Sequence, residues 1–207
     1  LMIEEIRTSP LNSDTVLSTT RRTRKFMASN RDSVYVSDDD QRCLMNQILQ
    51  KIDRESELLQ RSILSNDVPK AIENIDTICK ELRTTMLSPK NYYYVYLRVY
   101  DVLQPFYSYL VHTYKDSLPV LYERVQYVYY CLPRLYLMCV VGAAIVQKKE
   151  SSVAEVMKDL VEMCRAVQHP TKGLFVRCFL LDMFKDKLPS DVNGQKYDGS
   201  LADSVNF

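Results

Sequence analysis

The stretch that decides the fold is LPRLYLMCVVGAAIV, residues 132–146. Its part from residue 135 to residue 146 is the longest purely apolar run in the chain, and it is bounded by Pro133 and Arg134 on one side and by residues 147–149 (QKK) on the other. The run is shorter than the roughly 20 residues that cross a bilayer. A helix that is apolar on every side is typical of a protein core. We therefore expect a buried central helix from Arg134 to about Lys148.

Helical patterns continue on both sides of this run, and no segment shows convincing strand alternation. The predicted helices cover about residues 41–63, 68–85, 89–110, 118–132, 134–148, 153–167 and 174–188. The recurring unit is two helices in roughly 40 residues, which is the size of a HEAT-type repeat. The sequence therefore predicts an all-α fold, an α-solenoid of HEAT-like antiparallel helical hairpins with about seven helices. A plain helical bundle is the alternative.

Local signals support several of the predicted helix ends. Asn66 or Asp67 is expected to cap the second helix, because short polar side chains accept hydrogen bonds from the free N–H groups of a first turn. Ser152 and Glu155 have the spacing of a capping box. Pro105 lies within the third helix and is expected to kink it.

The two ends of the chain are polar and lack helical periodicity. We expect residues 1–40 to form a flexible polar arm, residues 41–188 to form the solenoid repeats, and residues 189–207 to form a polar linker toward a further helix that the sequence lacks. The arm holds a short basic cluster, RRTRK at residues 21–25. This cluster is a solvated run, a contact with an acidic membrane surface or a targeting signal.

The composition argues against nucleic acid, metal and catalytic chemistry. The formal net charge is +1, with 27 Lys and Arg against 26 Asp and Glu, so the basic excess of a nucleic-acid-binding protein is missing. The six cysteines form no CxxC pair and are expected to be buried free thiols. Only His112 and His169 could support a zinc site or a catalytic base, and both are expected to be helix-end residues. We predict no enzyme activity, no cofactor and no metal site.

Arg134 and the tyrosines are the polar residues that call for an explanation. A cation in the first turn of the most apolar helix must be paired if it is buried. We expect Arg134 to form an internal ion pair, to Glu123 or Asp101, or to be offered to a partner, and the two roles do not exclude each other. The tyrosine clusters should mostly pack between helices, with residues such as Tyr94 or Tyr129 as contact residues. These clusters are residues 92–94 with 96, and residues 127, 129 and 130.

Four segments, in this order along the chain, resemble the vacuolar protein sorting-associated protein 35 family, the large α-solenoid subunit of retromer. They are ELRTTMLSPK (81–90) followed by a Tyr pair at 92–93, LYERVQY (121–127), PRLYL (133–137), and DLVEMCRAVQHP (159–170) followed by GLF (173–175). The resemblance covers about residues 43–188. Ala166 departs from the family pattern, which usually has Gly there, and residues 1–40 match nothing in the family.

The resemblance implies a scaffold subunit of the retromer cargo-recognition complex, which retrieves transmembrane cargo from endosomes to the Golgi and the plasma membrane. In this family the N-terminal repeats bind the arrestin-like retromer subunit of the vacuolar protein sorting 26 family, and the arginine of PRLYL is needed for that association. The partner-binding residues carried onto this chain are Pro133, Arg134, Leu135, Tyr136 and Leu137.

The resemblance also implies further partners and a location. Sorting nexins, a Rab-type late-endosomal GTPase and cargo tails are expected to bind, while the metallophosphoesterase-like subunit should need a C-terminal part that this sequence lacks. The sequence resembles an N-terminal fragment, cut near Asp203 where the family continues into the next helix. We expect a cytoplasmic protein, peripheral on the cytosolic face of endosomes, whose membrane association is indirect.

One alternative belongs to a different class of protein. An unrelated helical bundle could enclose a ligand or lipid cavity lined by tyrosine side chains. It predicts an enclosed pocket with converging polar groups.

Overall fold

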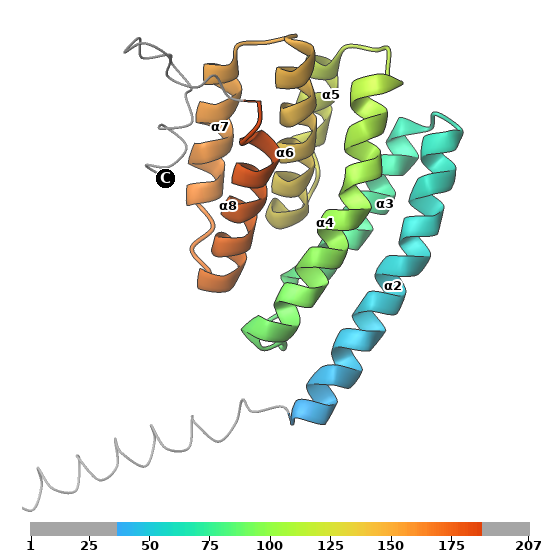
Figure 1. The fold of residues 1–207 in the computed structure, drawn as a ribbon, viewed down its shortest axis with the longest axis vertical. Helices are drawn as coiled ribbons and strands as arrows, with labels where there is room; N and C mark the ends of the chain where they lie inside the picture. The colour runs from blue at the N-terminus through green and yellow to red at the C-terminus, as the bar shows by residue number, and fades with distance from the viewer. Residues whose placement is uncertain (1–36, 188–207) are drawn as a thin grey trace, which may run out of the picture. The chain divides into compact units, whose positions relative to one another are not determined.

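The structure is a computed structural model that describes residues 37–187. Within this range the regular structure is entirely helical (Figure 1), which confirms the predicted all-α architecture and the expected number of helices. The elements are α2 (Asp38–Leu64), α3 (Val68–Lys80), the 3₁₀ turn η1 (Glu81–Arg83), α4 (Pro89–His112), α5 (Leu118–Val125), α6 (Cys131–Lys148), α7 (Val153–Arg165) and α8 (Pro170–Phe184). Most of the predicted polar arm, residues 1–36, and all of the predicted linker, residues 189–207, lie outside the described residues.

Helix α6 is the centre of the fold, as the apolar run predicted. It packs against α3, α4, α5, α7 and α8, and every residue from Leu135 to Val146 is buried. Consecutive helices run antiparallel (Figure 1). By length and composition alone, α6 could also cross a membrane, but 78% of it is buried inside the chain. Its apolar surface is thus covered by the neighbouring helices, as in the core helix of a helical domain.

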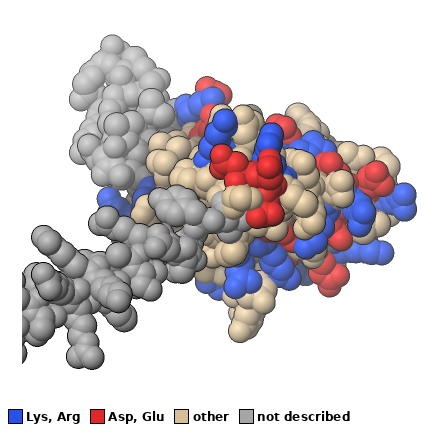
Figure 2. All heavy atoms as spheres, turned by 90° about the horizontal axis from the view of Figure 1, so that it is seen from below, with Lys and Arg blue, Asp and Glu red and all other residues tan. Residues whose placement is uncertain are grey.

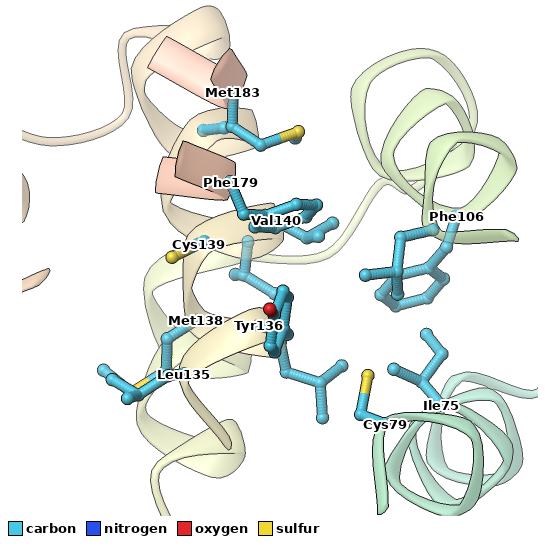
Figure 3. Packing of buried hydrophobic residues seen from close by; sticks show 14 of the residues in the cluster. Ile75, Cys79, Phe106, Leu135, Tyr136, Met138, Cys139, Val140, Phe179 and Met183 are labelled. Atoms are coloured by element: carbon cyan, nitrogen blue, oxygen red, sulfur yellow. The ribbon is translucent and has the colours of Figure 1, made fainter. Parts of the chain in front are cut away.

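The core joins distant parts of the chain around one face of α6. Figure 3 shows Tyr136 of α6 lying between Cys79 of α3 and Phe179 of α8, with Phe106 of α4 close by. The ring centroids of Tyr136 and Phe179 are 4.9 Å apart, and both side chains are fully buried. Burying side chains of this size contributes about 1.5–3 kcal/mol each, before packing terms are added. The core therefore fixes the rotation of α6 about its own axis.

Helix α2 is attached to α3 and α4 by polar contacts as well as by its apolar stripe. The buried amide of Asn74 donates a hydrogen bond to the Ser62 hydroxyl at 3.0 Å. Arg98 of α4 forms an ion pair of 2.7 Å with Asp53 of α2. The Gln41 side chain accepts the backbone N–H that precedes α4, at 2.8 Å. These three contacts are spaced along α2 and hold its register against the next hairpin.

Some helix ends differ from the prediction. Helix α2 begins at Asp38, inside the acidic run rather than after it. Helix α3 ends at Lys80, and η1 replaces the predicted last turn. Helix α5 ends at Val125 instead of residue 132, because α6 begins at Cys131 and places Pro133 in its first turn, where a missing N–H leaves no hydrogen bond unmade.

The predicted caps and cysteines had mixed outcomes. Asp67 caps α3 by accepting the backbone N–H of Lys70, as expected, whereas Ser152 stands before α7 without a side-chain capping bond. His169 caps α8 through its Nδ1 atom, 3.5 Å from a backbone nitrogen, and His112 is the last residue of α4. All six cysteines are free thiols. The expected burial is confirmed for Cys79, Cys139 and Cys164 and is wrong for Cys43, Cys131 and Cys178, which lie on outward edges of their helices.

Candidate functional site

The five residues predicted to bind a partner form the first turns of α6 and differ sharply in exposure. Pro133, Leu135, Tyr136 and Leu137 are buried in the core, and Arg134 is half-buried. A fully buried side chain cannot touch a partner without local unfolding. In this conformation a partner could reach this segment through Arg134, while the other four residues hold the helix in place.

The Arg134 guanidinium is held by a backbone carbonyl and not by a carboxylate. Its Nη1 atom donates a hydrogen bond of 3.3 Å to the carbonyl oxygen of Gln126, which follows α5. Neither Glu123 nor Asp101 forms an ion pair with it among the described residues, so the expected internal pair is not formed. A guanidinium has five N–H donors. Most of these donors have no partner within residues 37–187.

Tyr136 is the buried polar group of this segment. Its hydroxyl has no hydrogen-bond partner among the described residues, although the side chain is completely buried. Burial raises the pKa of this hydroxyl well above its usual value, and the neighbouring Tyr92 and Tyr96 add to the shift. The group therefore stays neutral and acts as a packing ring.

Beside the first turn of α6 lie charged residues that sequence reasoning missed. The Arg83 guanidinium of η1 stacks on the Tyr130 ring at 3.8 Å, and the Lys80 ammonium lies 5.3 Å from the same ring. The Lys172 ammonium of α8 donates a 2.6 Å hydrogen bond to the Arg83 carbonyl oxygen. No local pattern pointed to this group, because 89 residues separate Lys172 from Arg83.

The tyrosine clusters divide between core and surface. Tyr92 and Tyr96 are buried and contact Phe175 of α8, with ring centroids 5.3 and 4.8 Å apart. Tyr94 is 46% exposed, and Tyr129 is 85% exposed in the loop between α5 and α6. The two tyrosines that were singled out as contact residues are therefore accessible to a partner.

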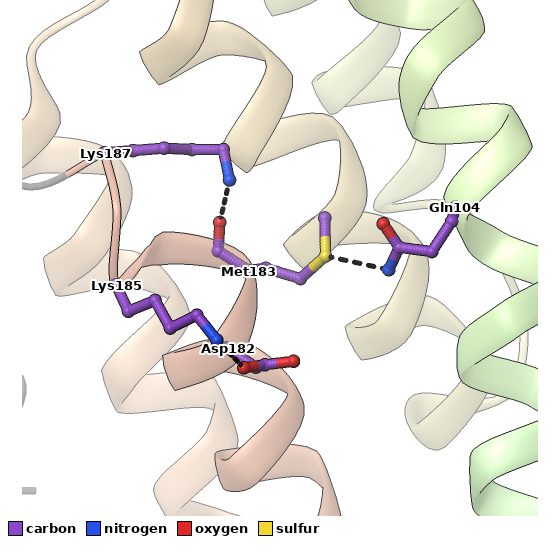
Figure 4. A network of polar contacts seen from close by, with 5 residues as sticks. All are labelled: Gln104, Asp182, Met183, Lys185 and Lys187. Carbon is purple, nitrogen blue, oxygen red and sulfur yellow. Dashed lines mark hydrogen bonds and ion pairs between the residues drawn. The ribbon is translucent and has the colours of Figure 1, made fainter.

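A polar network joins α4 to the end of α8 (Figure 4). Asp182 forms an ion pair of 2.6 Å with Lys185 and accepts a hydrogen bond from the Tyr100 hydroxyl. Burial raises the pKa of Tyr100 to about 12, and the bond to Asp182 adds to the shift. Gln104 of α4 lies 3.7 Å from the Met183 sulfur. Each side chain drawn in Figure 4 contacts another residue of the chain, so we interpret this network as a structural link between helices.

Two hollows formed by described residues are open at the surface. One of about 340 Å³ lies between α2 and α3 and includes Lys51 and Glu81. Another of about 340 Å³ includes Asn66, Tyr114 and Arg124. The ligand-cavity alternative predicted an enclosed pocket lined by the tyrosine clusters, and neither hollow contains a residue of these clusters. Within residues 37–187 no three His, Cys, Asp or Glu side chains are placed to hold a metal ion.

Charge on the end of the molecule where α4, α6 and α8 begin is mixed. Figure 2 shows Lys and Arg interspersed with Asp and Glu on this face, with uncharged residues between them. A surface for nucleic acid would carry a basic stripe. This end of the helices instead offers small groups of charge among accessible tyrosines, as a protein-binding surface does.

The comparisons with known proteins all match the same family. The family model of vacuolar protein sorting-associated protein 35 matches residues 44–207. The protein of that name from Dictyostelium discoideum is 41% identical over 150 residues, which is 72% of this chain and 19% of the relative. Vacuolar protein sorting-associated protein 35A from Arabidopsis thaliana is 41% identical over 154 residues, again 72% of the chain and 19% of the relative.

A fungal relative shows the same relation. Vacuolar protein sorting-associated protein 35 from Schizosaccharomyces pombe is 37% identical over 160 residues, covering 74% of this chain and 19% of the relative. The chain therefore spans about a fifth of the length of the curated relatives it matches. The matched region contains α6 and the cluster beside it.

Proposed function

The chain belongs to the vacuolar protein sorting-associated protein 35 family, and we propose that it acts in vacuolar protein sorting as part of the scaffold of the retromer cargo-recognition complex. Its helical hairpins present a surface for protein partners, over which binding energy is spread rather than focused in a pocket. Retrieval of transmembrane cargo from endosomes to the Golgi and the plasma membrane is the process that this scaffold serves.

The arrestin-like retromer subunit is the partner that we assign to the N-terminus of α6. The observation that carries this assignment is the contrast within residues 133–137, in which one accessible cation stands among four buried side chains. One N–H group of the Arg134 guanidinium binds the Gln126 carbonyl oxygen, and most of the others have no partner among the described residues. An arginine that is held by one carbonyl and otherwise accessible suits a carboxylate or a carbonyl edge on the partner.

The remaining partners follow from the same family. Sorting nexins, a Rab-type late-endosomal GTPase and cargo tails would meet the surface of these hairpins, and a metallophosphoesterase-like subunit would meet another part of the full-length protein. Attachment to the cytosolic face of endosomes would then be indirect, through such partners. The role is that of a scaffold, without catalysis.

Arg134→Ala tests the assignment. We expect the affinity for the purified arrestin-like subunit, measured by isothermal titration calorimetry, to fall at least about tenfold, because a charge-assisted hydrogen bond contributes about 1.5–3 kcal/mol. Arg134→Lys should recover part of it, since lysine keeps the charge and can still reach the Gln126 carbonyl. Far-UV circular dichroism should show unchanged helix content.

Arg124→Ala is the matched control. Arg124 is an exposed arginine of α5 that lies at the hollow with Asn66 and Tyr114, away from the first turn of α6. This variant should bind the arrestin-like subunit with wild-type affinity. Equal affinities for Arg134→Ala and wild type would refute the site, and equal losses for Arg134→Ala and Arg124→Ala would show a non-specific charge effect.

A further inference from the structure

A second surface lies beside the first turn of α6 and contains none of residues 133–137. We call it the basic–tyrosine cluster, and it consists of Lys80, Arg83, Tyr129, Tyr130 and Lys172. Direct contacts join all five residues. Arg83 and Lys80 lie over the Tyr130 ring, and Tyr129 meets that ring edge-on with the ring centroids 4.8 Å apart. The Lys172 ammonium donates a hydrogen bond to the Arg83 carbonyl oxygen. Three elements and one loop thus converge on one patch.

The positive charge of this cluster is only partly neutralised. Lys80 forms an ion pair of 2.7 Å with Asp76. Neither Arg83 nor Lys172 pairs with a carboxylate among the described residues. The pKa of Lys172 is lowered, first by burial and then by the Arg83 charge. The positive charges of Arg83 and Lys172 thus repel each other, and a carboxylate bound between them would offset this repulsion.

The aromatic part of the cluster is unusually accessible. Tyr129 is 85% exposed, and its loop neighbour Tyr127 is 88% exposed. Tyrosine and arginine are enriched where proteins bind proteins, because each offers a flat apolar surface together with a hydrogen-bond donor. Arg83 is already ordered by its stack on Tyr130, so less side-chain entropy is lost when it binds a ligand.

We propose that the basic–tyrosine cluster binds a short acidic segment of a partner protein, with carboxylates on Arg83 and Lys172 and an apolar side chain against Tyr129. The charge is complementary, and the arginine fork matches the two oxygens of a carboxylate. The proposal does not depend on which subunit binds Arg134, because the two surfaces share no residue.

An anionic lipid surface is the competing occupant. Recognition of such a surface typically uses about four to eight adjacent Lys and Arg. This cluster has two cations without a carboxylate partner in residues 37–187, and a third that is paired with Asp76. Acidic residues also lie among the basic ones on this end of the helices (Figure 2). A flat anionic membrane would meet these acids as well, while a narrow peptide would avoid them.

The test is fluorescence anisotropy with a short fluorescein-labelled peptide of glutamate and leucine, added to the whole chain. Arg83→Ala combined with Lys172→Ala should weaken binding at least about tenfold, because two charge-assisted contacts are lost. Lys172→Ala also removes a bond to the backbone of η1, so a thermal melt must show that the variant is folded. Arg83→Glu alone disturbs no backbone contact and should abolish binding.

Lys158→Ala is the matched control, since Lys158 is an exposed lysine of α7 outside the cluster. It should bind the peptide as wild type does. A matching lysine–leucine peptide should not bind. Absence of saturable binding by the wild type, or equal binding by the Arg83→Glu variant, overturns the proposal. Binding to phosphatidylserine-containing vesicles that Arg83→Glu abolishes, without competition by the acidic peptide, overturns it in favour of a membrane.

Discussion

Tyr136→Phe is a substitution in the centre of the core that should make the protein more stable. The Tyr136 ring is fully buried and packs on Phe179, so a phenylalanine ring can occupy the same place. The only atom removed is a hydroxyl oxygen that has no hydrogen-bond partner among the described residues. Figure 3 shows the Tyr136 ring among buried side chains that include Phe179 and Cys79.

The magnitude follows from the cost of an unmade hydrogen bond. A buried polar group without a partner destabilises a fold by about 1–3 kcal/mol relative to the same group in water. Tyr136→Phe should recover part of this, and we expect the free energy of unfolding to rise by about 1 kcal/mol. In a chain of this size that raises Tm by about 2–4 °C.

The assay is urea unfolding followed by far-UV circular dichroism, with Tyr92→Phe as the matched control. Tyr92 is also a buried tyrosine, but its hydroxyl donates a 2.9 Å hydrogen bond to the Leu82 carbonyl oxygen. Its removal should lower the free energy of unfolding by about 1–2 kcal/mol. If Tyr136→Phe destabilises the protein as much as Tyr92→Phe does, the Tyr136 hydroxyl has a partner such as a buried water, and the reasoning fails.

Two further predictions concern α8. Gly173→Ala should lower the free energy of unfolding by about 1–3 kcal/mol in urea titrations, because the new Cβ would lie 2.6 Å from the Val167 carbonyl oxygen and force the backbone to move. The pKa of Asp182 is lowered by its hydrogen bond from Lys185, so its contribution is present at neutral pH and is lost as pH falls through and below its usual pKa of 3.8. Thermal melts should therefore show Asp182→Asn less stable than wild type near pH 7 and equally stable at the lowest pH; a difference in Tm that stays constant across pH would contradict this.

The sequence predicted the core better than it predicted the loops. A helix that is apolar on every side lies in a core or in a membrane, and the apolar run in α6 is too short to cross a bilayer, which leaves the core. The end of α5 was placed several residues too late, because Tyr127 and Tyr129 continue an apolar pattern that the chain does not bury. Propensity cannot distinguish a buried tyrosine from an exposed one when the deciding contacts come from other helices.

The proposed binding residues could also be predicted only in part from the sequence. Arg134 could be singled out because a charge stood next to an apolar run. Arg83 and Lys172 could not, because each is an ordinary surface cation in its own segment and becomes informative only beside the other. Pairing the first turn of α8 with η1 requires the fold to bring them together around α6.

The burial pattern of residues 133–137 constrains what any substitution there can reveal. Changes at Leu135, Tyr136 or Leu137 act on the core first, so a loss of partner binding by such a variant reports folding as much as contact. Arg134 is different, because its side chain is only half-buried and makes one hydrogen bond, to the Gln126 carbonyl oxygen. The apolar residues would then act by fixing the rotation of α6, which sets the direction in which Arg134 projects. A core that fixes this direction lowers the entropy lost on binding, and in our proposal this is why an interaction surface is built on the most deeply buried helix of the fold.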